Sequence, residues 1–270
     1  MQQSRYFLSP LVWGLIIISW YASIQAQHPY HSSWSKDGWI IGAGTAVAIS
    51  ALAVNFSITP LTEQEIERLS RESVNAFDRP ATYNYSKTLA GMSDVLVSLN
   101  AAAAMLLLFD QNIRNDWQTL SIMSMETALL TTFIPMCVKG QVQRIRPFAY
   151  NSNVPLDGKT TREVKRSFFS GHTSAAFAAS VFISTVYSDY FPHSKWKPFV
   201  WTGSLLLAST VGFLRYESGA HFPTDIITGA VVGSIIGYMI PRLHRQNDHR
   251  VSITPLAYRG NMGLSFCIQF

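Results

Sequence analysis

Nine residues in three short blocks have the chemistry needed to bind a phosphate group and attack its phosphorus. They supply three cations, two imidazoles, a carboxylate and a serine–glycine turn. In chain order they are Lys139, Arg146 and Pro147; Ser170, Gly171 and His172; and Arg215, His221 and Asp225. Each block alone is an ordinary helix end, but a chance match of all nine is on the order of one in a million. We therefore interpret the three blocks as one site.

The first block is predicted to close a helix with two cations on one rim. Pro147 stops any helix there, and Lys139 and Arg146 lie about two helical turns apart. A basic helix end that matches the helix dipole is the ordinary alternative. Arg144, the neighbouring cation, is left outside the predicted site.

The second block is predicted to open a helix that binds anions. Ser170 is a natural N-cap, and free backbone amides at a helix start suit phosphate oxygens. Gly171 allows close approach of the backbone, and His172 is placed to donate a proton.

The third block combines an imidazole with a carboxylate. His221 and Asp225 are four residues apart and share a helix face if the helix begins early enough. The carboxylate then orients one ring nitrogen and leaves the other free to act as a nucleophile or base. The alternative is that Asp225 only caps the helix.

Composition indicates a membrane protein of one domain. The 270 residues are 48% hydrophobic and only 14% charged, against about 25% charged in ordinary soluble domains. The net charge of +5 is concentrated between Lys139 and Arg166, which indicates anion handling and no nucleic-acid partner. Cys137 and Cys267 are too far apart in sequence for a metal knuckle and do not indicate a disulfide framework.

Residues 1–26 resemble a secretory signal peptide. Arg5 precedes an apolar stretch, and Ala26 ends a small-residue cleavage region. An uncleaved N-terminal anchor is the alternative, although the apolar run is short against the roughly 20 residues of a membrane span.

Residues 27–245 are predicted to form an all-α domain, a six-helix bundle embedded in the membrane. Each of its six apolar segments is long enough for a helix and close to the length of a membrane span. The third and fourth segments contain polar residues and are expected at the centre of the bundle. The segments are Trp39–Phe56, Leu89–Phe109, Leu120–Val138, Thr173–Phe191, Phe199–Leu214 and Ile226–Ile240.

Three further features are predicted around these segments. Thr62–Arg79 is expected to form an amphipathic surface helix that starts in a capping box of Thr62 and Glu65. Gly229, Gly233 and Gly237 are spaced for close helix packing. The tail, residues 246–270, is expected to contain a short β-hairpin.

The order of the segments brings the three blocks together. A polar loop joins the first block to the second, and an out-and-back helix pair joins the second to the third. All three therefore lie on the same side of the predicted bundle.

The blocks resemble the signature of the type 2 phosphatidic acid phosphatases, a family that shares its site with class A acid phosphatases and vanadium haloperoxidases. The family pattern is KxxxxxxRP, PSGH and SRxxxxxHxxxD, and the match spans Lys139 to Asp225. Phe169 stands where the family has Pro, and Leu214 stands where it has Ser. Neither change removes a charge or an imidazole, so both concern fine geometry only.

The resemblance implies a role for each site residue. His221 attacks phosphorus to form a phosphohistidine, Asp225 orients it, and His172 protonates the leaving group and then activates water. No metal and no cofactor is expected, and vanadate is an expected inhibitor. The phosphate-binding residues implied are Lys139, Arg146, Ser170, Gly171 and Arg215.

The leading hypothesis is a phosphatase acting on a membrane lipid: phosphatidate, phosphatidylglycerophosphate, an isoprenyl pyrophosphate or a lipid A phosphate. The alternative is a soluble periplasmic acid phosphatase of broad specificity. A vanadium haloperoxidase or a non-enzymatic membrane protein is less favoured. We expect the cell envelope as the location, in the inner membrane or periplasm, with the catalytic face periplasmic. The number of membrane crossings opposes a periplasmic site. If the N-terminus is exported and the next three segments all span the membrane, the site lies in the cytoplasm.

Overall fold

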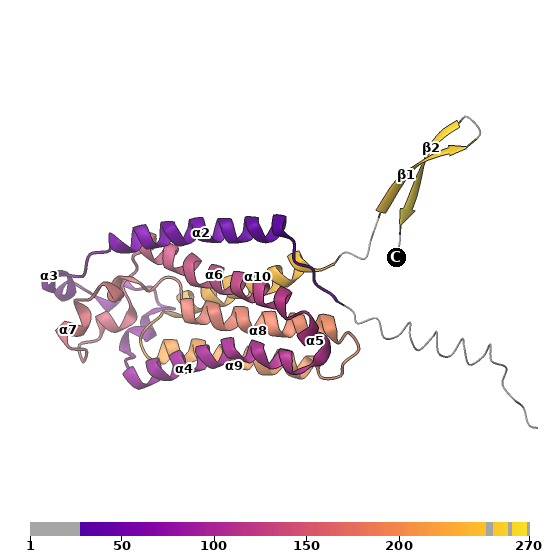
Figure 1. Cartoon of the computed structure of the whole chain (residues 1–270). Helices are drawn as coiled ribbons and strands as arrows, with labels where there is room; N and C mark the ends of the chain where they lie inside the picture. Colours follow the sequence, from indigo (N-terminus) through magenta and orange to yellow (C-terminus); the bar gives the residue numbers. More distant parts are fainter. Residues whose placement is uncertain (1–27, 247–250, 259–260, 269–270) are drawn as a thin grey trace, which may run out of the picture.

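Six long helical segments run side by side in this structure, a computed structural model that describes residues 28–246, 251–258 and 261–268. They match the six predicted apolar segments, so the prediction of a six-helix bundle is confirmed (Figure 1). The expected leader, residues 1–26, lies outside the described residues. The segments are α2 (Trp34–Phe56), α4 (Lys87–Ala103) with its 3₁₀ extension η3 (Ala104–Phe109), α6 (Trp117–Val142), α8 (Gly171–Tyr190), α9 (Lys197–Glu217) and α10 (Pro223–His244).

Serine side chains and prolines fix where these helices begin. Ser33, Ser86 and Ser170 each accept a hydrogen bond from a backbone amide of the first turn of α2, α4 and α8. Helices α9 and α10 begin with proline in the first turn. Both devices satisfy or remove amides that have no partner inside the helix.

Helix α8 is the centre of the bundle and packs against α4, α6, α9 and α10. Its inward side chains include buried hydroxyl residues, and Ser180 illustrates how these are satisfied. Its Oγ donates to the carbonyl of Ser204 at 2.7 Å and accepts from Asn100 Nδ2 at 3.1 Å. The prediction that the more polar helices lie at the centre is confirmed for α8, whose buried polar residues are Thr173, Ser174, Ser180, Ser184 and Thr185.

A stripe of glycines holds α10 against α8. A Cβ on Gly229, Gly233 or Gly237 would lie 2.1–2.5 Å from a carbonyl oxygen of α8 or its cap. The two backbones can approach this closely only without side chains between them. Helix α10, an almost wholly apolar segment, is therefore also part of the centre, with its other face exposed.

The outer surface of the bundle is apolar. Within the described residues, four helical stretches are long and apolar enough to cross a membrane: Trp34–Phe56, Lys87–Phe109, Trp117–Tyr150 and Pro223–His244. Large hydrophobic side chains point outward from them at high exposure, and such a surface marks contact with lipid. The length and composition of its helices thus make the chain a membrane protein. The exposed residues include Trp39, Ile49, Leu52, Val95, Leu99, Leu106, Ile227, Val231 and Ile235.

The loops gather at two ends of the bundle. We call the end where α6 and α9 finish and α8 and α10 begin the site end, and the opposite end the far end. The site end carries the short elements α3 (Glu63–Glu67), η1 (Arg71–Ser73), η2 (Arg79–Tyr83), η4 (Pro147–Tyr150), α7 (Leu156–Lys159) and η5 (Arg162–Lys165). The far end carries α5 (Gln111–Asn115).

The surface helix predicted for Thr62–Arg79 is wrong as a single element. Its capping box exists, since Glu65 N donates to Thr62 Oγ1 and Thr62 N to Glu65 Oε2, but α3 ends at Glu67. Beyond it, the side chains of Ser70 and Asn75 accept from backbone amides two and three residues later. Such local bonds favour turns over a continuous helix.

The predicted C-terminal hairpin is confirmed. Strands β1 (Val251–Tyr258) and β2 (Asn261–Ile268) pair antiparallel, from Val251 opposite Ile268 to Tyr258 opposite Asn261.

Candidate active site

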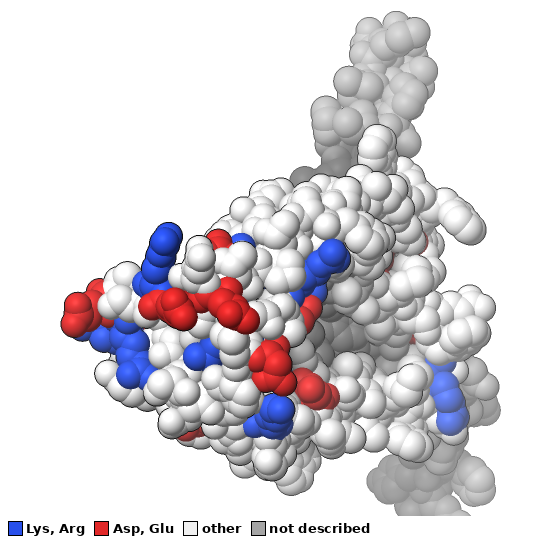
Figure 2. Space-filling view, turned by 90° about the vertical axis from the view of Figure 1, so that its left-hand side faces the viewer, with Lys and Arg blue, Asp and Glu red and all other residues white. Residues whose placement is uncertain are grey.

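The three sequence blocks meet at the site end of the bundle, which Figure 2 views directly. Basic and acidic side chains gather there amid a mostly uncharged surface. Backbone hydrogen bonds join the blocks: Ser170 N donates to the carbonyl of Asp225 at 3.0 Å, and Phe148 N to that of Gly219 at 2.9 Å. Gly219 has φ 71°, and a Cβ on it would lie 2.1 Å from the carbonyl oxygen of Asn84. The turn after α9 therefore requires glycine.

The first block straddles the end of α6. The helix ends at Val142 with Gln143 in the left-handed conformation, so Arg146 lies beyond the helix in extended backbone. The ammonium of Lys139 faces the start of α8, where it lies 3.6 Å from the position of a Cβ on Gly171. Arg146 donates to Glu163 at 3.2 Å. The two cations do meet at one rim, but a turn of chain, and not two turns of helix, separates them.

The second block opens α8 as predicted. Ser170 Oγ accepts from Thr173 N and lies 2.8 Å from Thr173 Oγ1. His172 Nε2 lies 2.9 Å from Oδ1 of Asp94, and Arg215 Nη1 lies 3.1 Å from the same oxygen. Asp94, a carboxylate of α4, thus lies between His172 of the second block and Arg215 of the third.

His221 precedes α10 and is fully buried, with Asp225 in the first turn of that helix. Its Nδ1 lies 3.6 Å from Asp225 Oδ2, which is longer than a hydrogen bond. Neither ring nitrogen has a hydrogen-bond partner among the described residues. Asp225 also accepts from the backbone amide of Phe222 at 2.9 Å. Asp225 therefore both caps α10 and lies next to the imidazole of His221.

Asp225 is held by two side chains that the sequence blocks do not include. Ser167 Oγ donates to its Oδ2 at 2.5 Å, and Arg144 Nη1 to its Oδ1 at 2.5 Å. Through its other nitrogen, Arg144 reaches the buried Asp78 at 2.7 Å. Arg144 lies outside the predicted site residues but contacts Asp225, which is one of them.

The charges around His221 determine its protonation state. Burial lowers the pKa of His221 well below its usual value, and the cations Lys139, Arg146 and Arg215 lower it further. A lowered pKa favours the neutral imidazole, which has a lone pair on one ring nitrogen, at neutral pH. Burial alone would raise the pKa of Asp78, but hydrogen bonds from Asn75, Arg144 and Thr224 hold it below its usual value.

Comparison with known proteins agrees with this geometry. Residues 119–248 match the model of the PAP2 superfamily, and this stretch contains all nine residues of the three blocks. The similarity to the PAP2 superfamily thus extends over residues 119–248. The resemblance seen in the sequence is thereby confirmed.

Two relatives are lipid phosphatases by name. The chain is 34% identical over 95 residues to a probable diacylglycerol pyrophosphate phosphatase 1 from Schizosaccharomyces pombe. It is 31% identical over 80 residues to a lipid A 4'-phosphatase from Porphyromonas gingivalis. These matches cover 33% and 30% of this chain and 34% and 30% of those proteins, so the chain spans about a third of the curated relatives it matches.

One solved structure matches much of the chain at low overall similarity. It is a transmembrane PAP2-type phosphatidylglycerolphosphate phosphatase from Bacillus subtilis, with a TM-score of 0.46 and 20% sequence identity. The similarity covers 74% of this chain and 94% of that one.

An open cavity of about 320 Å³ leads from the PAP2 site along the bundle between α4 and α6. Val97 and Ala175 are among its apolar lining, and Lys139, Arg166, Gly171 and His172 line its charged part. A second apolar cavity of about 270 Å³ lies further along the same helices, lined by Ala101, Ala104, Leu120 and Phe182 among others. We call the first of these cavities, which has Lys139 and His172 at one end, the α4–α6 groove.

Four residues at the PAP2 site were missed from the sequence: Ser93, Asp94, Arg166 and Ser167. Arg166 lies in the basic stretch from Lys139 to Arg166, so composition carried a signal for it. Asp94 is an isolated acid in an apolar segment, which by itself marks a functional position. Ser93, whose Oγ accepts from Arg215 at 3.1 Å, and Ser167 carried no signal of their own.

Proposed function

We propose that the chain is a metal-independent phosphatase that hydrolyses the phosphate monoester or pyrophosphate of a membrane lipid through a phosphohistidine. The observation that carries the proposal is that the buried His221 and Asp225 lie at the same end of the bundle as Lys139 and His172, which line the α4–α6 groove. The names of the relatives support a lipid phosphate as substrate. Phosphatidate, phosphatidylglycerophosphate, isoprenyl pyrophosphate and lipid A phosphate share this chemistry.

The proposed reaction has two steps. His221 Nε2 attacks phosphorus while the bond from phosphorus to the leaving oxygen breaks, and His172 gives that oxygen a proton. Water then passes a proton to His172 and attacks the phosphohistidine, which releases phosphate and neutral His221. Asp225, whose carboxylate lies nearest Nδ1, steadies the positive ring. Lys139, Arg146, Arg215, the Ser170 hydroxyl and the Gly171 amide neutralise the phosphoryl oxygens.

The test of the activity is phosphate release by the purified protein in detergent. His221→Ala is expected to abolish release from lipid phosphates, and orthovanadate to inhibit the unchanged protein. The matched control is His193→Ala, which removes an exposed imidazole from the loop between α8 and α9 and should leave the rate unchanged. Wild-type activity in His221→Ala, or a requirement for added Mg²⁺, would overturn the assignment.

The α4–α6 groove favours a lipid over a small soluble phosphate ester, because an acyl or prenyl tail can lie in it while the headgroup reaches the cations. Val97→Trp places a large ring in the groove at one helical turn from Asp94. We expect KM for a long-chain lipid phosphate to rise at least about tenfold, the loss of about 1.4 kcal/mol of tail binding. KM for an aryl phosphate should stay unchanged. Equal effects on both substrates would favour the broad-specificity acid phosphatase.

We propose a periplasmic catalytic face in the inner membrane. Residues 28–33 lie at the far end, opposite the site (Figure 1), so a periplasmic site requires these residues to be cytoplasmic. In that arrangement the leader at 1–26 does not act as an exported signal peptide.

A further inference from the structure

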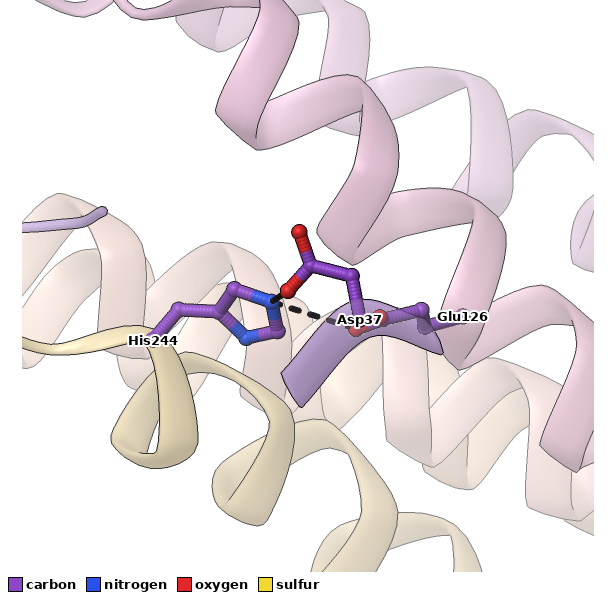
Figure 3. A group of neighbouring side chains, drawn as sticks. All are labelled: Asp37, Glu126 and His244. Carbon is purple, nitrogen blue, oxygen red and sulfur yellow. Dashed lines mark hydrogen bonds and ion pairs between the residues drawn. The ribbon is translucent and has the colours of Figure 1, made fainter. Parts of the chain in front are cut away.

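Three side chains that the proposed reaction does not use meet at the far end of the bundle. They are Asp37 in the first turn of α2, Glu126 in α6 and His244 at the end of α10 (Figure 3). All three are buried, with exposed fractions of 6%, 0% and 0%. His244 Nε2 lies 3.1 Å from Asp37 Oδ1 and 3.4 Å from Glu126 Oε2. Three helices thus each contribute one ligand-type atom to the same point.

Neighbouring groups orient two of these side chains. His244 Nδ1 lies 2.9 Å from the carbonyl oxygen of Ile240. A carbonyl can only accept, so Nδ1 carries the proton and Nε2 turns to the carboxylates. Ser32 Oγ donates to Asp37 Oδ2 at 2.5 Å, which leaves Oδ1 facing the histidine. Outer bonds of this kind, from imidazole to carbonyl and onto a carboxylate, are typical of metal-binding residues.

Glu126 lacks hydrogen bonds that would orient its carboxylate, among the residues described. Neither of its carboxylate oxygens has a hydrogen-bond partner within the described part of the chain, and the side chain is completely buried. Burying a carboxylate that has no hydrogen bond is costly. The neighbouring cation Lys36 is engaged elsewhere, since its ammonium donates to the carbonyl of Leu243 at 3.0 Å. One divalent cation coordinated by a neutral imidazole and two carboxylates would leave the cluster with no net charge.

We propose that Asp37, Glu126 and His244 bind a Zn²⁺ ion. Imidazole nitrogen and carboxylate oxygen are both zinc ligands, and three protein ligands leave a fourth position for water. In a tetrahedral site with bonds of about 2.0–2.2 Å, ligand atoms lie about 3.3–3.6 Å apart, close to the separations of 3.1 Å and 3.4 Å from His244 Nε2 to the two carboxylates. Mg²⁺ and Ca²⁺ prefer six or more oxygen ligands, and zinc outcompetes Mn²⁺ and Fe²⁺ at such sites.

The ion would fasten the far end of the bundle. It joins α2, which lies on the outside, to α6 and α10. The chain before α2 is attached to the same place, because His31 N donates to the carbonyl of His244 at 2.8 Å and Gln246 N to that of Pro29 at 2.9 Å. The site is structural and takes no part in the proposed phosphatase reaction, so the failure of one proposal leaves the other intact.

The test measures zinc on tag-free, full-length protein in detergent. Elemental analysis of purified protein is expected to give about one zinc per chain. After chelator stripping and dialysis, titration with ZnCl₂ against a chromophoric chelator should restore one equivalent and raise the unfolding temperature. Glu126→Gln keeps the shape of the side chain and should weaken zinc binding at least about tenfold, a loss seen even for outer-shell partners.

His31→Gln is the matched control, because it removes an exposed imidazole next to the cluster without touching it. It should keep full zinc binding. Stripped wild-type protein that remains folded but takes up no zinc, with no change in unfolding temperature, would overturn the proposal. So would equal zinc binding by Glu126→Gln and the wild type. The wild-type titration decides the matter even if the variant fails to fold.

Discussion

Arg144 is the residue that joins the two buried acids supporting the site. Its guanidinium bridges Asp78 and Asp225, both with fully buried side chains, while Arg144 itself is 24% exposed. Arg144→Ala leaves both carboxylates buried without their cation. We expect the free energy of unfolding to fall by about 3 kcal/mol, measured by thermal unfolding in detergent. Arg144→Lys should recover little of it, since an ammonium cannot reproduce the planar fork.

The control for Arg144→Ala is Arg162→Ala. Arg162 is exposed and lies on the same side of the bundle, in η5. Its removal should change the unfolding temperature little. If both variants unfold at the same temperature as the wild type, the bridge does not stabilise the site.

His221 makes activity depend on pH in a way that can be tested. The proposed nucleophile must be unprotonated, and burial together with Lys139 and the two arginines lowers its pKa well below 6.5. The acid limb of kcat/KM due to His221 therefore lies below pH 6.5. Lys139→Gln removes one of the cations, so the pKa of His221 rises and the acid limb moves to higher pH.

The measurement is kcat/KM against pH for both proteins on one short-chain lipid phosphate, so that substrate ionisation cancels. Lys195→Gln, at an exposed far-end position, should leave the limb in place. An unchanged limb in Lys139→Gln would show that this cation does not act on the nucleophile.

At the scale of elements, the contact between α8 and α10 sets the geometry of the site. Helix α8 begins with Ser170 and His172, and α10 begins just after His221. Gly233→Ala would place a Cβ 2.1 Å from the carbonyl oxygen of Ser174, which forces the two helices apart. We expect destabilisation of about 1–3 kcal/mol and a loss of kcat, because the two histidines move relative to each other.

Gly203→Ala is the control within the same bundle. Gly203 lies in α9, and a Cβ there has no atom within 4 Å. Alanine favours a helix by about 0.8–1 kcal/mol over glycine, so this variant should be as stable as the wild type or more so. Equal stability of the two variants would contradict tight packing of α8 on α10.

At the scale of the whole molecule, an apolar outer surface between two polar ends predicts that the two ends face opposite sides of the membrane. Glu67 is exposed at the site end and Lys195 at the far end. Each is replaced by cysteine in a chain whose Cys137 and Cys267 are serine. With the proposed periplasmic site, an impermeant maleimide should label Glu67→Cys alone in intact spheroplasts. Labelling of Lys195→Cys alone would reverse the orientation, and labelling of both would contradict the spanning arrangement.

The sequence by itself determined the bundle and most of the site. Six apolar stretches of span length can satisfy their backbone only as helices, and their order alone puts Lys139, His172 and His221 at one end. Helix starts were also readable, because Ser170 and Thr62 cap through local bonds that need no distant partner.

Only the tertiary structure decided what depends on contacts between distant segments. Arg144 and Ser167 support Asp225, and Asp94 joins His172 to Arg215, over separations of 58 to 121 residues along the chain. The prediction of one surface helix over Thr62–Arg79 was wrong because local side-chain hydrogen bonds favour turns there over a continuous helix. The α4–α6 groove and the meeting of Asp37, Glu126 and His244 arise from how whole helices pack, and no spacing within one segment encodes either.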